Sequence, residues 1–397
     1  MAIPLSCLPK SLTKLTRRTL IASAASLPAL AHAKTMLGQR LVGAILAQMA
    51  DFGRAPLLLP SYIVPSTEQQ SGFGLTQANT AYVYDNALAG LLLLHAGYQQ
   101  EAELIGQALA MAQSHDRSFN DGRLRNGYAA GQMVSPAKLP GFWNSQTNQW
   151  DEDPYQLGSD TGPIAWAMLL WAKLGLQDPA NKAGDFLNAR LRAPLGYYGG
   201  FYGYDQSQQK LGWQSTEQNL DLAIAFKKLG RNADAAHAAR FVQAAYDART
   251  KLFKTGLTTT GQPGAMLAAD AGIWPYLAGL GSAASARQAI AGLRHGEGVG
   301  FSDASQGIWL EGTAFAALAL QSMGNTLAAD FMDTIKANIS PQGYVFACVT
   351  PVLATGLKIG PSLQKNIPDQ DFNYYRYPAL STTSWAGMAA LGMNPFH

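Results

Sequence analysis

Four acidic residues stand at or near the starts of separate apolar segments: Asp85, Asp160, Glu217 and Glu311. A carboxylate that enters an apolar segment costs free energy unless it is used or paired. Glycosidic bonds are hydrolysed by two carboxyl groups, one of which donates a proton while the other acts as base or nucleophile. We therefore predict that Glu311 and Glu217 are the general acid and its partner, in an order that the sequence leaves open. Asp85 and Asp160 would hold substrate or a water molecule.

Each carboxylate also has a structural interpretation. Asp160 fits the N-cap of a helix, where its charge favours the helix dipole. Residues 215–218 can form a capping box, which leaves Asp221 as a supporting site residue or a salt-bridge partner. Asp85 is poorly placed as a cap, and Glu311 precedes a segment without any other charge, so function is favoured for these two.

Aromatic residues and glycine are concentrated in the long segments between the apolar runs. Aromatic rings stack on the apolar faces of sugars, while carboxylates and amides bind sugar hydroxyls; the alternative for any one ring is packing within a loop. We predict that substrate is bound by Asn86, Trp143, Tyr198, Trp213, Asp221, Trp309, Tyr374 and Tyr375.

Other chemistries find little support in the sequence. The six histidines are scattered without the spacing of metal ligands. Neither a nucleophile elbow nor a P-loop is present, and the acidic run Asp151-Glu152-Asp153 fits an exposed turn better than a calcium loop. We therefore predict no metal and no cofactor.

Twelve helical patterns position the candidate residues. Their apolar side chains recur at helical spacing over about 36–52, 82–95, 99–114, 161–174, 180–192, 217–229, 233–246, 265–280, 283–293, 311–323, 327–338 and 382–391. Short glycine-containing links alternate with long segments at about 115–158, 193–214, 247–264, 294–308 and 339–380. Long segments in a compact domain are usually functional.

The helices fall into two kinds. Those that follow a long segment are apolar on all sides, which predicts burial, whereas those that follow a short link also carry polar positions. An inner and an outer ring satisfy both patterns, and the first and last helices can pair to close the circle. The sequence thus predicts an all-α (α/α)6 barrel as one domain over residues 34–397, with the site at the inner-helix N-termini. An open solenoid is the alternative.

Residues 1–33 have the layout of a secretory signal. A basic head with the twin arginines Arg17-Arg18 precedes a short apolar core and the small-x-small sequence Ala31-His32-Ala33. The core is shorter than the roughly 20 residues that cross a bilayer. We predict export through a twin-arginine-type signal to the periplasm or the medium, with no stable membrane insertion.

Removal of this leader changes the charge of the chain. The leader carries four basic residues and no acid, so the formal net charge falls from +3 to −1, which gives no indication of nucleic acid binding. Cys348 becomes the sole cysteine, so no intramolecular disulfide forms.

Three segments of the chain resemble a known superfamily. Residues 84–87, 215–221 and 309–314, set in the twelve-helix layout, resemble the six-hairpin glycosidases of bacterial exported proteins, and the likeness extends over about residues 36–394. The resemblance implies an (α/α)6 toroid with a carbohydrate cleft and acid/base carboxylates. Such a fold also hosts lyases, phosphorylases and non-catalytic members, so the fold alone does not decide the activity.

We therefore expect an exported glycoside hydrolase that acts on a poly- or oligosaccharide; the sequence makes no prediction of oligomeric state. One alternative is a polysaccharide lyase, for which residues 374–376 (Tyr-Tyr-Arg) are the only compact cluster that combines a tyrosine base with a cation for a uronate. The other is a non-catalytic exopolysaccharide-binding protein.

Overall fold

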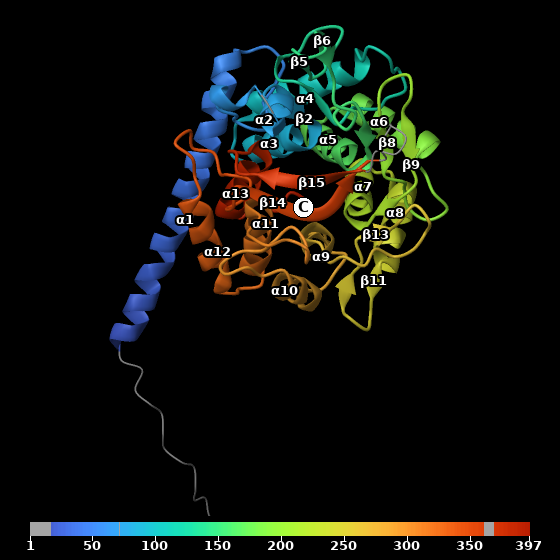
Figure 1. Cartoon of the computed structure of the whole chain (residues 1–397). Helices are drawn as coiled ribbons and strands as arrows, with labels where there is room; N and C mark the ends of the chain where they lie inside the picture. Colours follow the sequence, from blue (N-terminus) through green and yellow to red (C-terminus); the bar gives the residue numbers. More distant parts are fainter. Residues whose placement is uncertain (1–16, 71, 361–368) are drawn as a thin grey trace, which may run out of the picture.

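The computed structural model describes residues 17–70, 72–360 and 369–397. Within these residues the chain forms six helix pairs arranged around one centre (Figure 1), together with the short helix α2 (Gly72–Gln77). In these parts of the chain no helix combines the length and the apolar character that crossing a membrane requires.

Six helices form a closed inner ring. Each contacts the next, and the last contacts the first. Small side chains allow this close approach: every residue of Ala314–Leu320 is buried, and Gly90 and Gly387 lie against leucines of neighbouring helices. The inner helices are α3 (Val83–His95), α5 (Thr161–Leu174), α7 (Thr216–Lys228), α9 (Ala269–Leu277), α11 (Leu310–Ser322) and α13 (Leu380–Leu391).

The outer helices each bury one face against an inner helix. In the last of them, Ala328, Phe331, Met332 and Ile335 are buried while the intervening positions are polar, as the amphipathic pattern requires. They are α1 (Arg17–Phe52), α4 (Gln99–Ser114), α6 (Gln177–Arg190), α8 (Asn232–Ala244), α10 (Ala283–Gly292) and α12 (Leu327–Ala337). Because α1 packs against α13, the circle closes, and the predicted (α/α)6 fold is confirmed over the open solenoid.

Two predicted helix boundaries are wrong. The first helix was predicted to start at residue 36, but α1 begins at Arg17, because the alanine-rich segment before residue 36 favours the helix as strongly as the segment after it. The N-terminal part of α1 extends away from the ring (Figure 1), and Leu37 is the first buried residue among those whose side chains are described. The predicted leader boundary at residue 33 therefore falls inside α1, and Lys10 and Lys14 lie outside the described residues. Helix α9 is shorter than predicted and spans nine residues.

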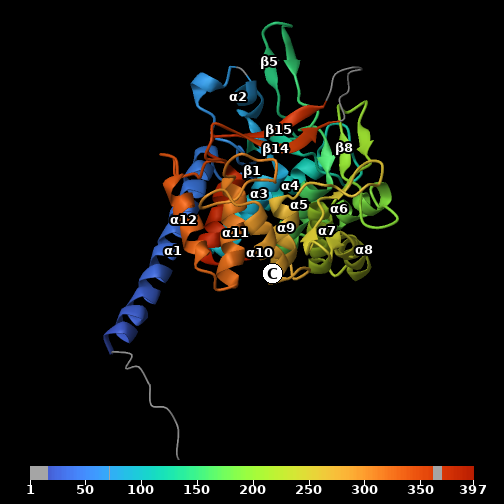
Figure 2. The same ribbon diagram turned by 60° about the horizontal axis from the view of Figure 1, so that its bottom comes forward.

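The long segments carry small antiparallel sheets that gather on one side of the ring (Figure 2). Several of their strands end where an inner helix begins, so that pairing fixes the backbone just before the first helical turn. The pairs are β1 (Leu57–Leu58) with β4 (Gly131–Gln132), β2 (Thr80–Tyr82) with β3 (Gly127–Ala129), β5 (Phe142–Asn144) with β6 (Gln149–Asp151), β10 (Gln214–Ser215) with β13 (Gly256–Leu257), β11 (Tyr246–Asp247) with β12 (Leu252–Phe253), and β14 (Val352–Ile359) with β15 (Gln370–Tyr375). A three-stranded sheet joins β7 (Ser159–Asp160), β8 (Gly200–Tyr202) and β9 (Gln209–Leu211).

Aromatic side chains fill the centre of the ring. Trp274 and Trp385 stack with ring centroids 5.5 Å apart, and Trp166 meets both of them edge-on. Phe396, next to the C-terminal residue, contacts all three tryptophans. This aromatic floor leaves room for a ligand only on the side of the long segments.

Candidate active site

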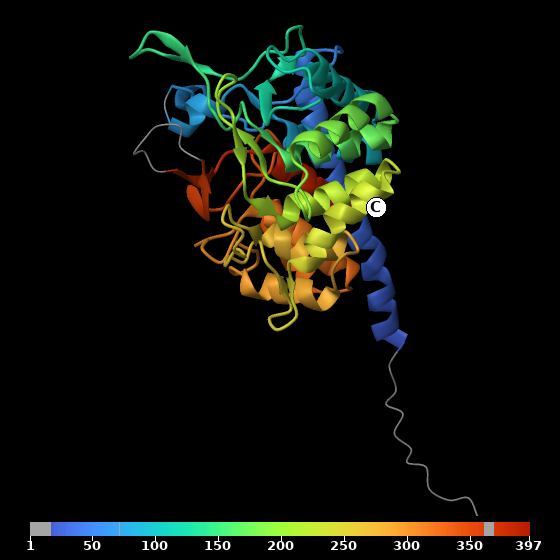
Figure 3. The same cartoon turned by 90° about the vertical axis from the view of Figure 1, so that its right-hand side faces the viewer.

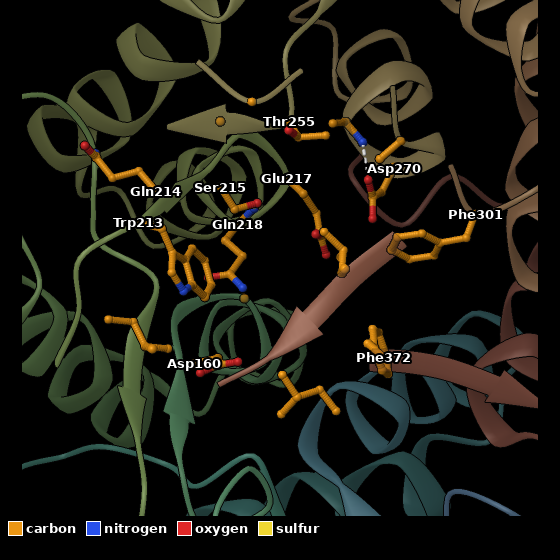
Figure 4. Close-up of a pocket in the computed structure, with 18 of the residues that line it drawn as sticks. Asp160, Trp213, Gln214, Ser215, Glu217, Gln218, Thr255, Asp270, Phe301 and Phe372 are labelled. Carbon is orange, nitrogen blue, oxygen red and sulfur yellow. Dashed lines mark hydrogen bonds between the residues drawn. The ribbon is translucent and has the colours of Figure 1, made fainter. Parts of the chain in front are cut away.

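A cavity of about 440 Å³ lies on the side of the ring where the long segments gather. Four carboxylic acids from four different inner helices line it: Asp160, Glu217, Asp270 and Glu311. Figure 4 shows three of them around the cavity, with Trp213 on one side and Phe301 and Phe372 on the other. The hairpin β14–β15 contributes Leu357, Lys358, Phe372 and Tyr374 to the wall.

The four acids occupy equivalent places on their helices. Asp160 directly precedes the first residue of α5, and Glu217, Asp270 and Glu311 are each the second residue of α7, α9 and α11. At a helix N-terminus the dipole favours a negative charge, whereas burial opposes it. Asp160, Asp270 and Glu311 are buried and Glu217 is half-buried, so the protonated state competes with the ionised state in each of them.

Glu311 has the best-defined hydrogen bonds. The Tyr84 hydroxyl donates to its Oε1 atom and the Ser381 hydroxyl to its Oε2 atom, both at 2.7 Å. The indole N–H of Trp385 donates in turn to the Tyr84 hydroxyl at 2.9 Å. Burial raises the pKa of Glu311 to about 7, although both hydrogen bonds favour the carboxylate. The carboxyl group is therefore held in one orientation and titrates near neutral pH.

Glu217 and Asp270 share a proton. Their carboxyl groups hydrogen-bond to one another, which requires that one of the two is protonated. Asp270 also accepts the backbone N–H of Ala271 at 2.5 Å, so it is the better stabilised anion. Burial raises the pKa of Asp270 to about 6, whereas burial and the neighbouring carboxylates of Asp270 and Asp221 raise the pKa of Glu217 well above its usual range. Glu217 is thus the member of the pair that keeps the proton.

Asp221 lies one turn after Glu217, outside the cavity wall. Its side chain is fully buried, and neither carboxylate oxygen has a hydrogen-bond partner of ordinary geometry. Burial raises its pKa well above the usual range, and the nearby indole of Trp166 only partly offsets this effect. Asp221 therefore strengthens proton retention at Glu217 without touching a ligand.

The capping interpretations have mixed outcomes. Ser215 accepts the backbone N–H of Gln218 and caps α7, which leaves Glu217 without a capping role. Asp160 occupies the N-cap position of α5 as predicted, but its side chain makes no capping hydrogen bond. Burial raises the pKa of Asp160 to about 7, although the hydrogen bond with Asn126 lowers it.

Replacement of Asp160 by Asn is expected to stabilise the protein in a pH-dependent way. The carboxyl is protonated in the folded state up to about pH 7 but ionises near 4 when unfolded, so the folded state binds more protons between these values and loses stability as the pH rises. The Asn variant lacks this loss, and its free energy of unfolding should exceed that of the wild type by up to about 4 kcal/mol at pH 7 and by little at pH 4. Urea denaturation at both pH values measures the difference. An equal effect at both would contradict the raised pKa.

The structure places some of the predicted site residues in the cavity wall and others away from it. Six of them line the cavity: Asp160, Glu217, Glu311, Trp213, Trp309 and Tyr374. Asp85 and Asp221 are buried outside its wall, and burial raises the pKa of Asp85 well above its usual range. Asn86 instead binds the backbone N–H and C=O of Leu59 and thereby attaches that segment to α3.

Three predicted aromatic residues lie away from the cavity. Tyr198 packs against the core with Lys210 over its ring. Trp143 is on β5 with about 55% of its surface exposed. Tyr375 is adjacent to Tyr374 in β15, and because successive side chains of a strand point to opposite faces, it lines a separate outer cavity together with Arg376. These three residues therefore do not line this cavity, and their predicted role in binding substrate stays a prediction.

The sequence prediction missed Asp270, Tyr84 and the aromatic walls. Asp270 is the only carboxylate in the apolar segment 265–280, which is the same signal that identified Glu311. Tyr84, Tyr155, Tyr202, Phe301 and Phe372 line the cavity from loops or helix starts, and no sequence pattern distinguishes them from loop packing.

Positive charge is scarce at the site. Lys358 is the one basic residue in the described cavity wall, and its ammonium group pairs with Asp371 on the neighbouring strand. No group of His, Cys, Asp and Glu side chains in the described ranges is arranged to hold a metal ion.

No protein-family model and no curated protein sequence matches the chain. Solved structures do match, among them a glycosidase variant in complex with glucose, with a TM-score of 0.59 and 13% identity over 91% of this chain and 98% of that one. A sugar epimerase from a ruminal bacterium has a TM-score of 0.58 at 12% identity, over 90% and 98% of the two chains. A novel alpha-amylase from Clostridium perfringens has a TM-score of 0.58 at 11% identity, also over 90% and 98%. These likenesses confirm the expected fold of the six-hairpin glycosidases, and at such identities they extend to the fold alone.

Proposed function

We propose that this protein is a carbohydrate-active enzyme, and specifically a glycoside hydrolase that acts on an uncharged poly- or oligosaccharide. One observation carries the proposal: buried carboxyl groups from four inner helices converge on one aromatic-walled cavity, with pKa values raised to about 6, to about 7, or well above the usual range. Carboxyl groups tuned in this way supply both a proton donor and a base near neutral pH. The glycosidases among the structural neighbours support the same reaction class.

The different environments of the two glutamates assign their roles. Glu217 retains its proton through Asp270 and is the general acid that protonates the leaving oxygen. Glu311 ionises more readily because Tyr84 and Ser381 donate to it, and it acts as the base or nucleophile.

The other candidate reactions lack an equivalent observation. A lyase needs a cation beside the uronate, but Lys358 pairs with Asp371, and Arg376 donates to Asn338 and to the Cys348 carbonyl away from the cavity. An epimerase and a D-mannose isomerase are also among the structural neighbours, so interconversion of sugars is tested together with hydrolysis.

The deciding experiment measures the products formed from a panel of neutral glucans, galactans and uronate polymers and from free hexoses. Release of reducing ends from a neutral glycan supports the hydrolase. Conversion of one free hexose to another by chromatography would replace the proposal with an isomerase or epimerase, and an unsaturated, UV-absorbing product would replace it with a lyase. Binding without any product would leave a carbohydrate-binding protein.

Replacement of Tyr84 by Phe is expected to move the pH dependence of hydrolysis. The variant lacks one of the two donors to Glu311, so the carboxylate is less stabilised and the pKa of Glu311 rises. We expect the acidic limb of the kcat/KM profile to move upward by about one pH unit. A Tyr276→Phe variant, altered outside the cavity, should keep the wild-type profile. A downward shift for Tyr84→Phe would mean that its hydroxyl does not stabilise the ionised form.

We also propose export through the N-terminal leader, which rests on the sequence of residues 1–33. Mass spectrometry of the protein recovered from the periplasm or medium should give a chain that starts near residue 34. Recovery of the intact chain from the cytoplasm would contradict export.

A further inference from the structure

Two tryptophans that lie outside the cavity form a pair on a projecting hairpin. Trp143 on β5 and Trp150 on β6 are directly paired in the antiparallel register, so their side chains share one face of the hairpin. They are 55% and 53% exposed, which is rare for side chains of this size. The hairpin, teal in Figure 3, stands out from the body, and Figure 2 places it on the same side of the helix ring as β14–β15, which forms part of the cavity wall.

Hydrogen bonds and close packing hold the hairpin and its two indole rings in one conformation. Asn144 donates to Asp151 across the strands at 2.7 Å, and its side-chain oxygen accepts two backbone N–H groups of the turn. The Trp150 indole lies over Gly141, where an added Cβ would be only 2.5 Å from its Nε1 atom. An ordered hairpin presents its aromatic faces at a small entropic cost, as preorganised binding surfaces do.

The chain from Trp150 leads directly to the cavity. Tyr155, five residues later, lines the cavity, and five residues of extended chain span at most about 18 Å. Beside this segment runs the one that follows β8: the Gly203 N–H donates to the Pro154 carbonyl at 3.1 Å. Tyr202 lines the cavity, and Tyr204 is 43% exposed. Both chain neighbours of Tyr204 are attached to the base of the hairpin, Gly203 through Pro154 and Asp205 through Arg117, so Tyr204 lies beside that base.

An ion network that is exposed at Arg117 and buried at Arg125 fixes this arrangement. Arg117 binds Glu152 through two hydrogen bonds and Asp205 through a third, and thus joins the hairpin base to the residue after Tyr204. Asp205 also pairs with Arg125, whose side chain is fully buried. Since these guanidinium groups are engaged with carboxylates, they are not free to bind a polyanion.

We propose that Trp143, Trp150 and Tyr204 form an aromatic track that binds the uncharged polysaccharide chain outside the cavity and leads it to Tyr202. This inference rests on the proposed glycoside hydrolase function. The ligand is the polymer itself, because Trp143 and Trp150 lie outside the cavity wall.

The test compares a Trp143→Ala/Trp150→Ala double variant with the wild type on a polymer and on a short substrate. On the neutral polymer cleaved by the wild type, KM should rise roughly tenfold, the loss expected for two aromatic contacts, while kcat stays unchanged. Both constants should stay unchanged on the trisaccharide of the same linkage. Tyr98→Ala, which removes an exposed ring from the short link between α3 and α4, is the matched control. Equal losses on polymer and trisaccharide, or none on either, would overturn the track.

A binding measurement keeps the inference separate from the catalytic proposal. In native gels that contain soluble starch, mixed-linkage β-glucan or galactan, the wild type and Tyr98→Ala should be retarded by at least one polymer. The double variant should migrate as it does in a gel without polymer, and Tyr204→Ala should be intermediate. Retardation that survives in the double variant, or that is absent from the wild type on all three polymers, would overturn the track whether or not hydrolysis is found.

Discussion

Replacement of Glu311 by Gln is expected to lower kcat by about 10²–10⁴-fold, the range that a general acid or base contributes. Glutamine has the same size and still accepts the Tyr84 hydroxyl through its carbonyl oxygen, but it can neither ionise nor take a proton from water. The fold should survive, because the wild-type carboxyl is already disfavoured by burial. We expect the melting temperature of the variant to equal or exceed that of the wild type above pH 7. Initial rates on the neutral glycan identified by the panel, together with thermal unfolding, measure both quantities.

The matched control for Glu311→Gln is Asp85→Asn. Asp85 is also a buried carboxylic acid with a strongly raised pKa, but it lies outside the cavity wall. Burial raises its pKa and so favours the neutral form, which an amide resembles, and the replacement should change kcat by less than about threefold, which corresponds to less than about 0.7 kcal/mol. If the Glu311→Gln variant keeps the wild-type kcat, Glu311 takes no part in the reaction. A loss as large in Asp85→Asn would show that the substrate reaches beyond this cavity.

The fold was predictable because two simple signals agree along the whole chain. Apolar character on all sides, as in α11, predicts an inner helix, and glycine at the short links predicts antiparallel partners. The small strands were missed because two or three residues give no periodicity, and their pairing with distant segments decides that they form. Residue 36 failed as a helix start because the alanine-rich segment before it also favours the helix, so Thr35 lies inside α1 and does not begin it.

The site was predictable where a charge stands out against an apolar helix. Glu311, Glu217 and Asp160 were found in this way, and Asp270 carries the same signal. The first turn of α3 shows what the pattern does not resolve. Adjacent helical side chains are about 100° apart, so Tyr84 reaches Glu311 whereas its neighbour Asp85 faces a different part of the core. Trp143 and Tyr375 lie away from this cavity because their directions depend on strand pairing and loop paths between distant segments.

Replacement of Asp270 by Asn tests the shared proton. In the wild type the Asp270 carboxylate accepts the proton of Glu217 and repels a second charge there, and both effects hold the pKa of Glu217 high. The asparagine amide carries no charge and can donate to the Glu217 carboxylate, so the pKa of Glu217 should fall. Because a general acid must be protonated, the alkaline limb of the kcat profile should move to lower pH by one unit or more. At pH values above the alkaline limb, the variant should therefore lose about tenfold in kcat for each unit by which the limb moves.

Profiles of kcat from pH 4 to 9 for Asp270→Asn and Asp221→Asn decide between a direct and a long-range effect. Asp221 raises the pKa of Glu217 through its charge alone and makes no hydrogen bond to it. Its amide variant should therefore shift the alkaline limb in the same direction but by less, and the kcat at the acidic end should stay near the wild-type value in both variants. If Asp270→Asn moves the limb upward, Glu217 is not the proton donor. The carboxylate role would then pass to Glu217, and Glu311, with its pKa of about 7, would be the acid.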